Sequence, residues 1–294
     1  MKKYLERVGD METPIIEVRD LWFEYPGRVV ALRGINLKIH RGEFLGIIGH
    51  NGSGKTTLVK HFNGLLKPTK GLVLVDGIDT RKLSVAQLSR KVGYVFQNPD
   101  HQIFAPTILE EVGFGLKNSG VPESEIIERV KEALQIVDLN KPLDASPHFL
   151  SVGEKHRLAI ASVLVTRPEV IILDEPTTGL DFKHCIQLMS IVKKLNERGH
   201  TIILVTHDMY LIAEFTRRVI VLREGRIVAD GSTKSIMSNI ELLEENFLYP
   251  PQVTLLARAI SKYGIPPNIV TTEEFVTSYG NLLSRLSTEN PNSL

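Results

Sequence analysis

Gly49-His-Asn-Gly-Ser-Gly-Lys55-Thr56 follows the continuously apolar stretch Phe44–Ile48 and leads into a helical pattern over Thr56–Leu65. Glycines let backbone N–H groups turn inward, and the helix N-terminus adds the positive end of its dipole. A strand, this loop and a helix in that order predict a phosphate-binding P-loop. Lys55 would neutralise the β- and γ-phosphates, and the Thr56 hydroxyl would ligate Mg²⁺. The predicted nucleotide-binding residues of this segment are Gly49, His50, Asn51, Gly52, Ser53, Gly54, Lys55, Thr56 and Thr57.

Further uninterrupted apolar runs on either side of the loop predict strands buried on both faces, as in a parallel sheet. They alternate with helical patterns, which predicts an α/β core. The predicted strands are Val170–Leu173, Thr201–Val205 and Val219–Leu222, and the predicted helices are Glu123–Val137, Lys155–Thr166 and Phe182–Glu197. Near the N-terminus, Ile16–Val18, Leu21–Phe23 and Ile35–Ile39 alternate apolar and polar residues, which predicts a small antiparallel sheet with a turn at Pro26-Gly27.

These patterns predict an α/β fold, a P-loop NTPase core with an N-terminal antiparallel β subdomain, an inserted helical subdomain and a short helical C-terminal extension. We expect a polar tail over 1–13, in which Met11 is a second candidate start, and an ATP-binding domain over 14–239. The helical subdomain covers about 97–167, and the C-terminal extension covers 240–294 with breaks at Pro250-Pro251 and Pro266-Pro267.

The stretch Val170-Ile-Ile-Leu-Asp174-Glu175-Pro176 ends a buried strand in two carboxylates. Such side chains lie at the carboxyl edge of the sheet, where α/β proteins bind their ligands. We expect Asp174 to hold the metal and Glu175 to face a water, with Pro176 keeping Glu175 in an extended conformation.

A helix start is predicted after Leu150-Ser-Val-Gly-Glu154, with the helix itself beginning at Lys155. Ser151 and Glu154 have the spacing of a capping box. Taken alone, this segment indicates no more than a helix N-terminus.

The overall composition narrows the possible roles. Lys and Arg total 35 against 34 Asp and Glu, a formal net charge of +1, which argues against a dedicated nucleic-acid binder. The lone cysteine, Cys185, fits a reducing cytosol, and no apolar run reaches the roughly 18–20 residues of a membrane helix. A role at a membrane would therefore act through a partner.

The order of the motifs resembles that of the ABC-type ATPase domain over about residues 15–235. The P-loop is followed by Tyr94-Val-Phe-Gln97, Leu-Ser-x-Gly-x, the Asp-Glu strand, Thr178-Gly-Leu-Asp181 and Val205-Thr-His207-Asp208. The resemblance implies that ATP is bound with Mg²⁺, held by Thr56, Gln97 and Asp174. It further implies roles for five side chains: Tyr25 stacks on adenine, Gln97 is the lid glutamine, Glu175 the general base, His207 the γ-phosphate switch and Asp181 part of the dimer loop.

In that family the signature loop, here Ser151, Val152, Gly153 and Glu154, serves the ATP bound to a partner subunit. The resemblance therefore implies a dimer with a second ABC ATPase subunit, either a second copy or a related chain. The usual Leu-Ser-Gly-Gly-Gln reads Leu150-Ser-Val-Gly-Glu154 here. Val152 adds bulk and Glu154 a negative charge near a phosphate, so we expect slower turnover at this site or a weaker site in a heterodimer.

Val95-Phe-Gln-Asn-Pro-Asp-His-Gln-Ile-Phe104 and Glu110-Glu-Val-Gly-Phe-Gly-Leu116 resemble the ATPase of energy-coupling factor importers, although His101 stands where that group commonly has Asn. The resemblance implies a transmembrane coupling protein, a solute-binding membrane subunit, a metal-ion or vitamin cargo and a peripheral place on the cytoplasmic side of the cell membrane. Two alternatives stay open: a soluble ABC ATPase acting on nucleic acid or ribosomes, and a weakly hydrolysing regulatory cassette. No nucleic-acid partner is expected.

Overall fold

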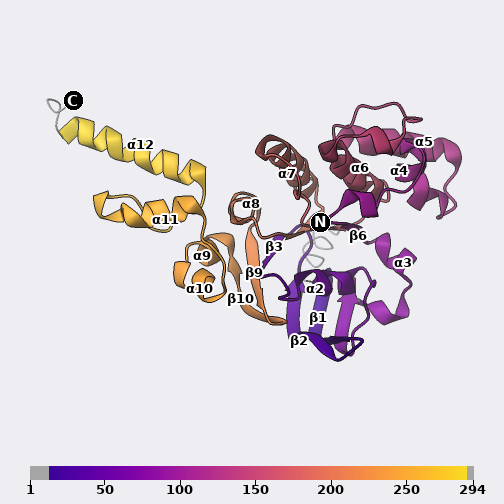
Figure 1. Ribbon diagram of the computed structural model, residues 1–294, viewed down its shortest axis with the longest axis horizontal. Coiled ribbons are helices and arrows are strands. Elements are labelled where there is room, and N and C mark those ends of the chain that lie inside the picture. The colour runs from indigo at the N-terminus through magenta and orange to yellow at the C-terminus, as the bar shows by residue number, and fades with distance from the viewer. Residues whose placement is uncertain (1–12, 290–294) are drawn as a thin grey trace, which may run out of the picture.

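The computed structural model describes residues 13–289 and contains two sheets, flanking helices and a helical arm at the C-terminal end (Figure 1). The strands are β1 (Ile16–Tyr25), β2 (Val29–Ile39), β3 (Phe44–Ile48), β4 (Lys70–Val75), β5 (Ile78–Asp79), β6 (Val92–Val95), β7 (Val170–Asp174), β8 (Thr201–Val205), β9 (Arg218–Arg223) and β10 (Arg226–Ser232). The helices are α2 (Lys55–Phe62), α3 (Val85–Ser89), α4 (Ile108–Lys117), α5 (Glu123–Ile136), α6 (Val152–Leu164), α7 (Phe182–Glu197), α8 (Met209–Phe215), α9 (Thr233–Met237), α10 (Ile240–Glu245), α11 (Gln252–Ala259) and α12 (Thr272–Glu289). Met11 and all of the predicted tail except Thr13 lie outside the described residues.

The N-terminal sheet is antiparallel, with the strand order β2-β1-β4-β5. Tyr25 pairs with Val29 across the turn at Gly27 and Arg28, whose φ angles are 94° and 66°. Left-handed backbone of this kind suits the tight connection between twisted strands. The predicted antiparallel β subdomain is confirmed.

The larger sheet has the order β10-β9-β3-β8-β7-β6. All neighbours from β9 to β6 run parallel, and β10 closes one edge antiparallel. Parallel strands buried on both faces explain the uninterrupted apolar runs of the sequence. Their carboxyl ends bring the P-loop, Gln97, Glu175 and His207 to the same edge, which confirms the predicted α/β core.

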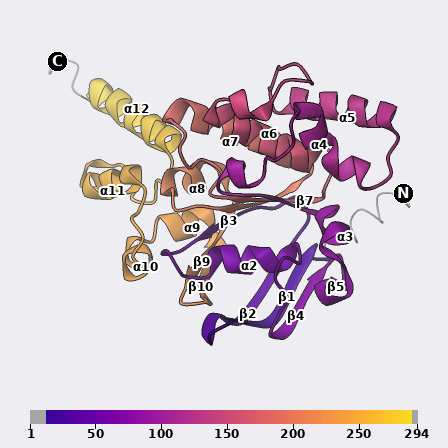
Figure 2. The ribbon, with the colours of Figure 1, turned by 45° about the vertical axis from the view of Figure 1, so that its right-hand side comes forward.

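Alternate residues of β3 enter different cores because successive side chains point to opposite faces of the sheet. Leu45 and Ile47 pack with α2 and the antiparallel sheet, whereas Phe44 and Ile48 pack with the helices of the other face. Figure 2 shows α2 beside β1, β2 and β4, with α5, α6 and α7 on the far side of the large sheet. The P-loop thus connects a strand and a helix that are both anchored in rigid cores.

Two predicted helix boundaries lie three residues from the observed ones, and the others lie within two. Helix α6 begins at Val152, three residues before the predicted Lys155, because Ser151 and Glu154 form a complete capping box. Helix α2 ends at Phe62, short of Leu65, because Asn63 caps it and Gly64 takes a φ of 75°.

Helices α11 and α12 form a small core of their own around Ala257, Ile265 and Ile269. Pro251 caps α11, in agreement with the predicted break. In Figure 1 the two helices project away from the sheets. Within residues 13–289, no helix is both long enough and apolar enough to cross a membrane.

Candidate functional site

The P-loop turns between β3 and α2 through glycines that no other residue can replace without strain. A Cβ on Gly49 would lie 2.3 Å from the Leu222 carbonyl oxygen, and one on Gly54 would lie 2.9 Å from that of Ala31. Gly54 caps α2 with a φ of 105° and no side-chain hydrogen bond, and the first turn of α2 carries no acidic residue. The amide groups at this helix start are therefore suited to an anion.

The Lys55 ammonium group is held across this loop. Its Nζ donates hydrogen bonds to the carbonyl oxygens of Gly49 (2.7 Å) and His50 (3.2 Å), and the residue is only 8% exposed. Burial lowers the pKa of Lys55, while the charges of Glu175 and Asp174 act in the opposite direction. An anionic phosphate would supply the countercharge that this buried cation lacks within hydrogen-bond distance.

Asp174 is the buried carboxylate beside the loop, and it accepts two side-chain hydrogen bonds. Thr56 Oγ1 donates to Oδ1 (3.2 Å), and the Tyr94 hydroxyl donates to Oδ2 (2.6 Å). Burial, followed by the Asp174 charge, raises the pKa of Tyr94, so the phenol remains a donor. The sequence pattern placed Tyr94 in a strand before Gln97 but gave no signal that its hydroxyl would meet Asp174.

The donor set near Asp174 fits Mg²⁺. Thr56, Asp174 and the exposed Gln97 all line the same pocket and offer hydroxyl, carboxylate and amide oxygens, the hard ligands that Mg²⁺ prefers. Among residues 13–289 there is no cluster of three or more His, Cys, Asp or Glu side chains able to hold a metal. A magnesium ion here would complete its shell with water and nucleotide phosphates, as is usual for this ion.

Glu175 departs from the predicted extended backbone, with a φ of 50° in the left-handed region. The preference of a residue before proline is overridden because the Glu175 N–H donates to the Val205 carbonyl oxygen (2.8 Å), fixing the turn out of β7. Its Oε1 lies 2.9 Å from His207 Nδ1, and its Oε2 accepts a hydrogen bond from Thr206 Oγ1 (3.2 Å). A left-handed backbone is strained at a residue other than glycine, and such strain is common at functional sites that hold a side chain in one direction.

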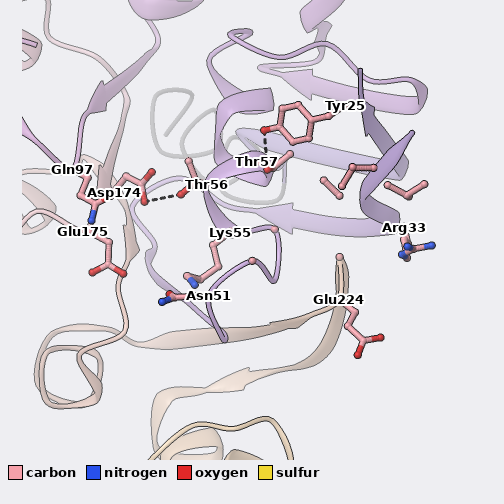
Figure 3. A pocket seen from close by; sticks show the side chains of 16 residues that line it. Tyr25, Arg33, Asn51, Lys55, Thr56, Thr57, Gln97, Asp174, Glu175 and Glu224 are labelled. Atoms are coloured by element: carbon pink, nitrogen blue, oxygen red, sulfur yellow. Dashed lines mark hydrogen bonds between the residues drawn. The ribbon is translucent and has the colours of Figure 1, made fainter. Parts of the chain in front are cut away.

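Most of the predicted nucleotide-binding residues line one pocket of about 670 Å³ (Figure 3). Those that line it are Tyr25, Asn51, Gly52, Gly54, Lys55, Thr56, Thr57, Gln97, Asp174 and Glu175. Gly49, His50, Ser53 and His207 do not line it, although all four adjoin residues that do. Sequence reasoning missed Val29, Val30, Ala31, Arg33, Glu224 and Gly225, which come from β2 and the β9–β10 turn. Their positions depend on tertiary pairing, as in the Arg33 N–H donation to the Gly225 carbonyl oxygen.

Tyr25 stands at one end of this pocket, about a third exposed. Its hydroxyl lies 3.1 Å from Thr57 Oγ1, and its ring meets Phe23 edge to face at 4.8 Å. These two contacts fix the orientation of the ring beside the start of α2. An aromatic face held this way can stack on a base.

The signature residues Ser151, Val152, Gly153 and Glu154 do not line the pocket. They adjoin the loop of Asp181 instead: a Cβ on Gly153 would lie 3.5 Å from His184 Cδ2, and Asp181 caps α7 by accepting from the His184 N–H (2.9 Å). Val152 is 52% exposed. This chain therefore presents the start of α6 on a surface separate from its own P-loop.

The negative charge of Glu154 is paired within the chain, which the sequence pattern did not predict. Its Oε2 accepts hydrogen bonds from the Ser151 N–H and hydroxyl (both 2.9 Å), and its Oε1 pairs with Lys141 Nζ (2.9 Å). The Lys141 contact and the Ser151 backbone hydrogen bond lower the pKa of Glu154 to about 2. The carboxylate closes the N-terminus of α6 and carries its own countercharge.

We expect Glu154→Ala to lower the free energy of unfolding by about 1 kcal/mol, because it removes half of the capping box. Glu154→Gln is the matched control, since an amide can still accept from Ser151 and only the charge is lost. The pKa of Glu154 is about 2 in the folded chain, below the ordinary 4.5. The native chain should therefore have a higher free energy of unfolding than Glu154→Gln, by the full margin above pH 4.5, and this margin should disappear as the pH falls towards 2. Urea unfolding across this range measures both effects; equal stability of native chain and Glu154→Ala at neutral pH would contradict the capping role.

Comparison with known proteins shows which family this chain is similar to. The family model described as ABC transporter matches residues 32–178. Over 272 residues the chain is 48% identical to an ABC transporter ATP-binding protein of Caldanaerobacter subterraneus, covering 92% of this chain but only 47% of that relative, about half its length. Over 250 residues it is 45% identical to the energy-coupling factor transporter ATP-binding protein EcfA of Methanocaldococcus jannaschii, covering 84% of this chain and 90% of that protein.

Two solved structures share the fold at appreciable identity. One is cbiO1 from Clostridium perfringens, part of the ABC transporter complex cbiONQ, with a TM-score of 0.72, 40% identity and coverage of 80% of this chain and 94% of that one. The other is an ATP-binding cassette in a dimeric post-hydrolysis state bound to ADP and Pi, with a TM-score of 0.67, 33% identity and coverage of 74% and 98%.

Proposed function

This chain belongs to the ABC transporter ATPases, and from that premise we propose that it is the ATP-hydrolysing subunit of a membrane importer of the energy-coupling factor type. Its cargo would be a metal ion or a vitamin. A transmembrane coupling protein would hold it peripherally on the cytoplasmic side of the cell membrane, and a small membrane subunit would bind the solute. The likeness to EcfA and to a component of cbiONQ supports the importer class.

The observation that carries this proposal is the short path from the nucleotide pocket to an apolar groove. Gln97 lines the pocket, and Phe104, seven residues later, lines the groove. Between them, Gln102 Nε2 donates to the Ala159 carbonyl oxygen (2.9 Å) and to Ser162 Oγ (3.1 Å), both on α6. Gln97 and the groove wall therefore belong to one short segment that is hydrogen-bonded to α6, and we expect a displacement of Gln97 to be transmitted along it.

The same segment is tied to the signature helix by charge. Asp100 Oδ1 pairs with Lys155 Nζ at 2.7 Å, and the Lys155 contact lowers the pKa of Asp100. Gln102 Oε1 also accepts from the Phe96 N–H (3.1 Å), which fixes the turn just before Gln97. The segment from Gln97 to Phe104 and helix α6 should therefore move together as one unit.

The groove itself fits an apolar helix from a membrane protein. It has a volume of about 790 Å³ and lies among α4, α5 and the segment before α4. Phe104 and Phe114 meet edge to face at 4.9 Å in its wall and are 62% and 46% exposed. Contiguous exposed apolar groups on a protein surface mark interaction sites. The docking of an amphipathic or apolar helix into a groove is a recurrent mode of recognition.

The nucleotide site would be completed by a second ABC ATPase subunit. Lys55 and the amide groups of the P-loop would hold the triphosphate, with Mg²⁺ on Thr56, Asp174 and Gln97, while Tyr25 would stack on adenine. Ser151 and Gly153 would face the γ-phosphate bound to the partner, whose own signature loop would close the site of this chain, with Asp181 linking the two sites. The separation of the α6 N-terminus from its own pocket and the likeness to a dimeric ADP·Pi cassette support this arrangement.

A binding and release cycle follows from the shared γ-phosphate. ATP favours the closed pair because both subunits contact that phosphate, and a ligand shifts a conformational equilibrium only through its differential affinity for the two states. Glu175 would take the proton from the attacking water while His207 contacts the γ-phosphate. Once the bond between the β- and γ-phosphates is cleaved, the γ-phosphate no longer joins the two subunits and the pair opens. The groove would transmit this movement to the coupling protein bound in it.

We expect Phe104→Glu and Phe114→Glu to release the chain from its membrane partner. A buried charge in an aromatic hot spot should reduce recovery of the coupling protein about 30-fold while ATP affinity stays unchanged. Phe149→Glu is the matched control, because Phe149 is 90% exposed and does not line the groove. Membrane fractionation with all three variants measures this; equal membrane association would contradict the groove as the docking site.

A further inference from the structure

Tyr94 is buried between the antiparallel sheet and the carboxylate that we assign to the metal, and its hydroxyl meets that carboxylate directly. We propose that Tyr94 is a positioning residue for Asp174, holding the carboxylate in the orientation that Mg²⁺ bound with nucleotide requires. The inference rests on the proposed function in assigning Asp174 to the metal.

The geometry restrains both oxygens of the carboxylate. Asp174 is 4% exposed and Tyr94 8% exposed, so neither can exchange its partner for bulk water. The Tyr94 hydroxyl is 2.6 Å from Oδ2, a short contact typical of an O–H donor to a carboxylate, while Thr56 Oγ1 is 3.2 Å from Oδ1. The two donors come from different elements, β6 and α2, and together they fix the rotation of the carboxyl group.

The ring of Tyr94 is itself fixed. Strand β6 pairs in parallel with β7, so that Tyr94 stands opposite Ile172, two residues before Asp174. The ring also meets Phe96 edge to face at 5.1 Å. A rotamer locked by packing and by the neighbouring strand is what a supporting residue of a metal site needs.

The chemistry of the donor matters as much as its position. A lysine or arginine here would restrain Asp174 but would also cancel the negative charge that attracts Mg²⁺. A neutral phenol donates a hydrogen bond and leaves that charge in place. Thr56 shows the complementary arrangement: its hydrogen is directed at Oδ1, which leaves oxygen lone pairs for a cation.

Removing the hydroxyl should leave Oδ2 as a buried acceptor without a partner. The carboxylate could then rotate towards Lys55 or draw in a water, and its fit to the cation would worsen. Loss of such an outer-shell partner typically weakens metal binding 10- to 100-fold. Nucleotide binding without a metal should be unaffected, because Tyr94 does not line the nucleotide pocket.

The test measures the affinity of the isolated full chain for a fluorescent non-hydrolysable ATP analogue, once with Mg²⁺ and once with EDTA. The ratio of the two Kd values is the gain in affinity that the metal supplies. For Tyr94→Phe we expect the EDTA value to stay within about twofold of native and the magnesium-dependent gain to fall about 10-fold. Tyr263→Phe, which removes the hydroxyl of a residue that is 63% exposed in the C-terminal extension, should change neither.

An unchanged gain in Tyr94→Phe would overturn the proposal, and so would an equal loss of affinity in both media, since that would indicate a general structural role. Phenylalanine keeps the ring contacts, and a thermal unfolding curve checks the fold. Both Kd values come from one preparation, so a reduced folded fraction leaves their ratio unchanged. The binding assay needs neither hydrolysis nor a membrane partner, so failure of the importer proposal would be seen separately.

Discussion

Glu175→Gln is expected to bind ATP as tightly as the native chain and to hydrolyse it at least about 100-fold more slowly. A positioned general base contributes about 10²- to 10⁴-fold to a rate, and an amide cannot accept the proton of the attacking water. The side chain is 12% exposed and already lies in contact with His207 and Thr206 at the edge of the pocket. The amide keeps nearly the same shape, so binding should be preserved.

Phosphate release and nucleotide binding, measured on the same preparation, check this prediction. Glu128→Gln on α5 provides a matched control that removes one acidic charge far from the pocket. Because unhydrolysed ATP would hold two subunits together, the Glu175→Gln protein should also accumulate as an ATP-dependent dimer in light scattering. Turnover near the native rate would refute the assignment of Glu175 as the base.

The second large effect is expected for Lys55→Ala, which should weaken ATP binding about 100-fold. The ammonium group is fixed by the Gly49 and His50 carbonyl oxygens and would make charge-assisted contacts with two phosphates. Such contacts contribute about 1.5–3 kcal/mol each, and tenfold in affinity corresponds to about 1.4 kcal/mol. Removal of a buried cation whose pKa is lowered by burial should leave the stability of the nucleotide-free chain unchanged or slightly raised.

Thermal unfolding with and without ATP separates the two parts of this prediction. The native chain should gain thermal stability on adding ATP, because a ligand that binds only the folded state stabilises it. Lys55→Ala should lose that gain without a lower melting temperature in the absence of nucleotide. Lys60→Ala, a neighbour on α2, is the control; an undiminished ATP-induced shift in Lys55→Ala would show that Lys55 does not hold phosphate.

The parts of the site that depend on local chain geometry were predictable from the sequence. A glycine-rich turn between an apolar strand and a helix places Lys55 and Thr56 at a helix start whatever the rest of the fold does. A strand ending in Asp174 places that carboxylate at the same sheet edge once the strands are parallel. The capping box of Ser151 and Glu154 was visible from its spacing, although the helix start was displaced by three residues.

The parts that depend on tertiary contacts were not predictable. Glu175 takes a left-handed backbone because its N–H meets Val205 on the neighbouring strand, which overrides the local effect of Pro176. Lys141 neutralises Glu154 from 13 residues away, and Tyr94 reaches Asp174 across 80 residues of sequence. Only the fold brings these groups together.

The proposed importer function requires that this cassette closes on a partner in response to ATP and that the pair drives a membrane protein. Affinity purification of tagged Glu175→Gln chain from native membranes with ATP, followed by mass spectrometry, tests this most directly. We predict recovery of a second ABC ATPase chain, an integral membrane coupling protein and a small solute-binding membrane subunit, whose identity would point to the cargo. Recovery from the soluble fraction alone, or with ribosomal or DNA-associated proteins, would contradict the importer function.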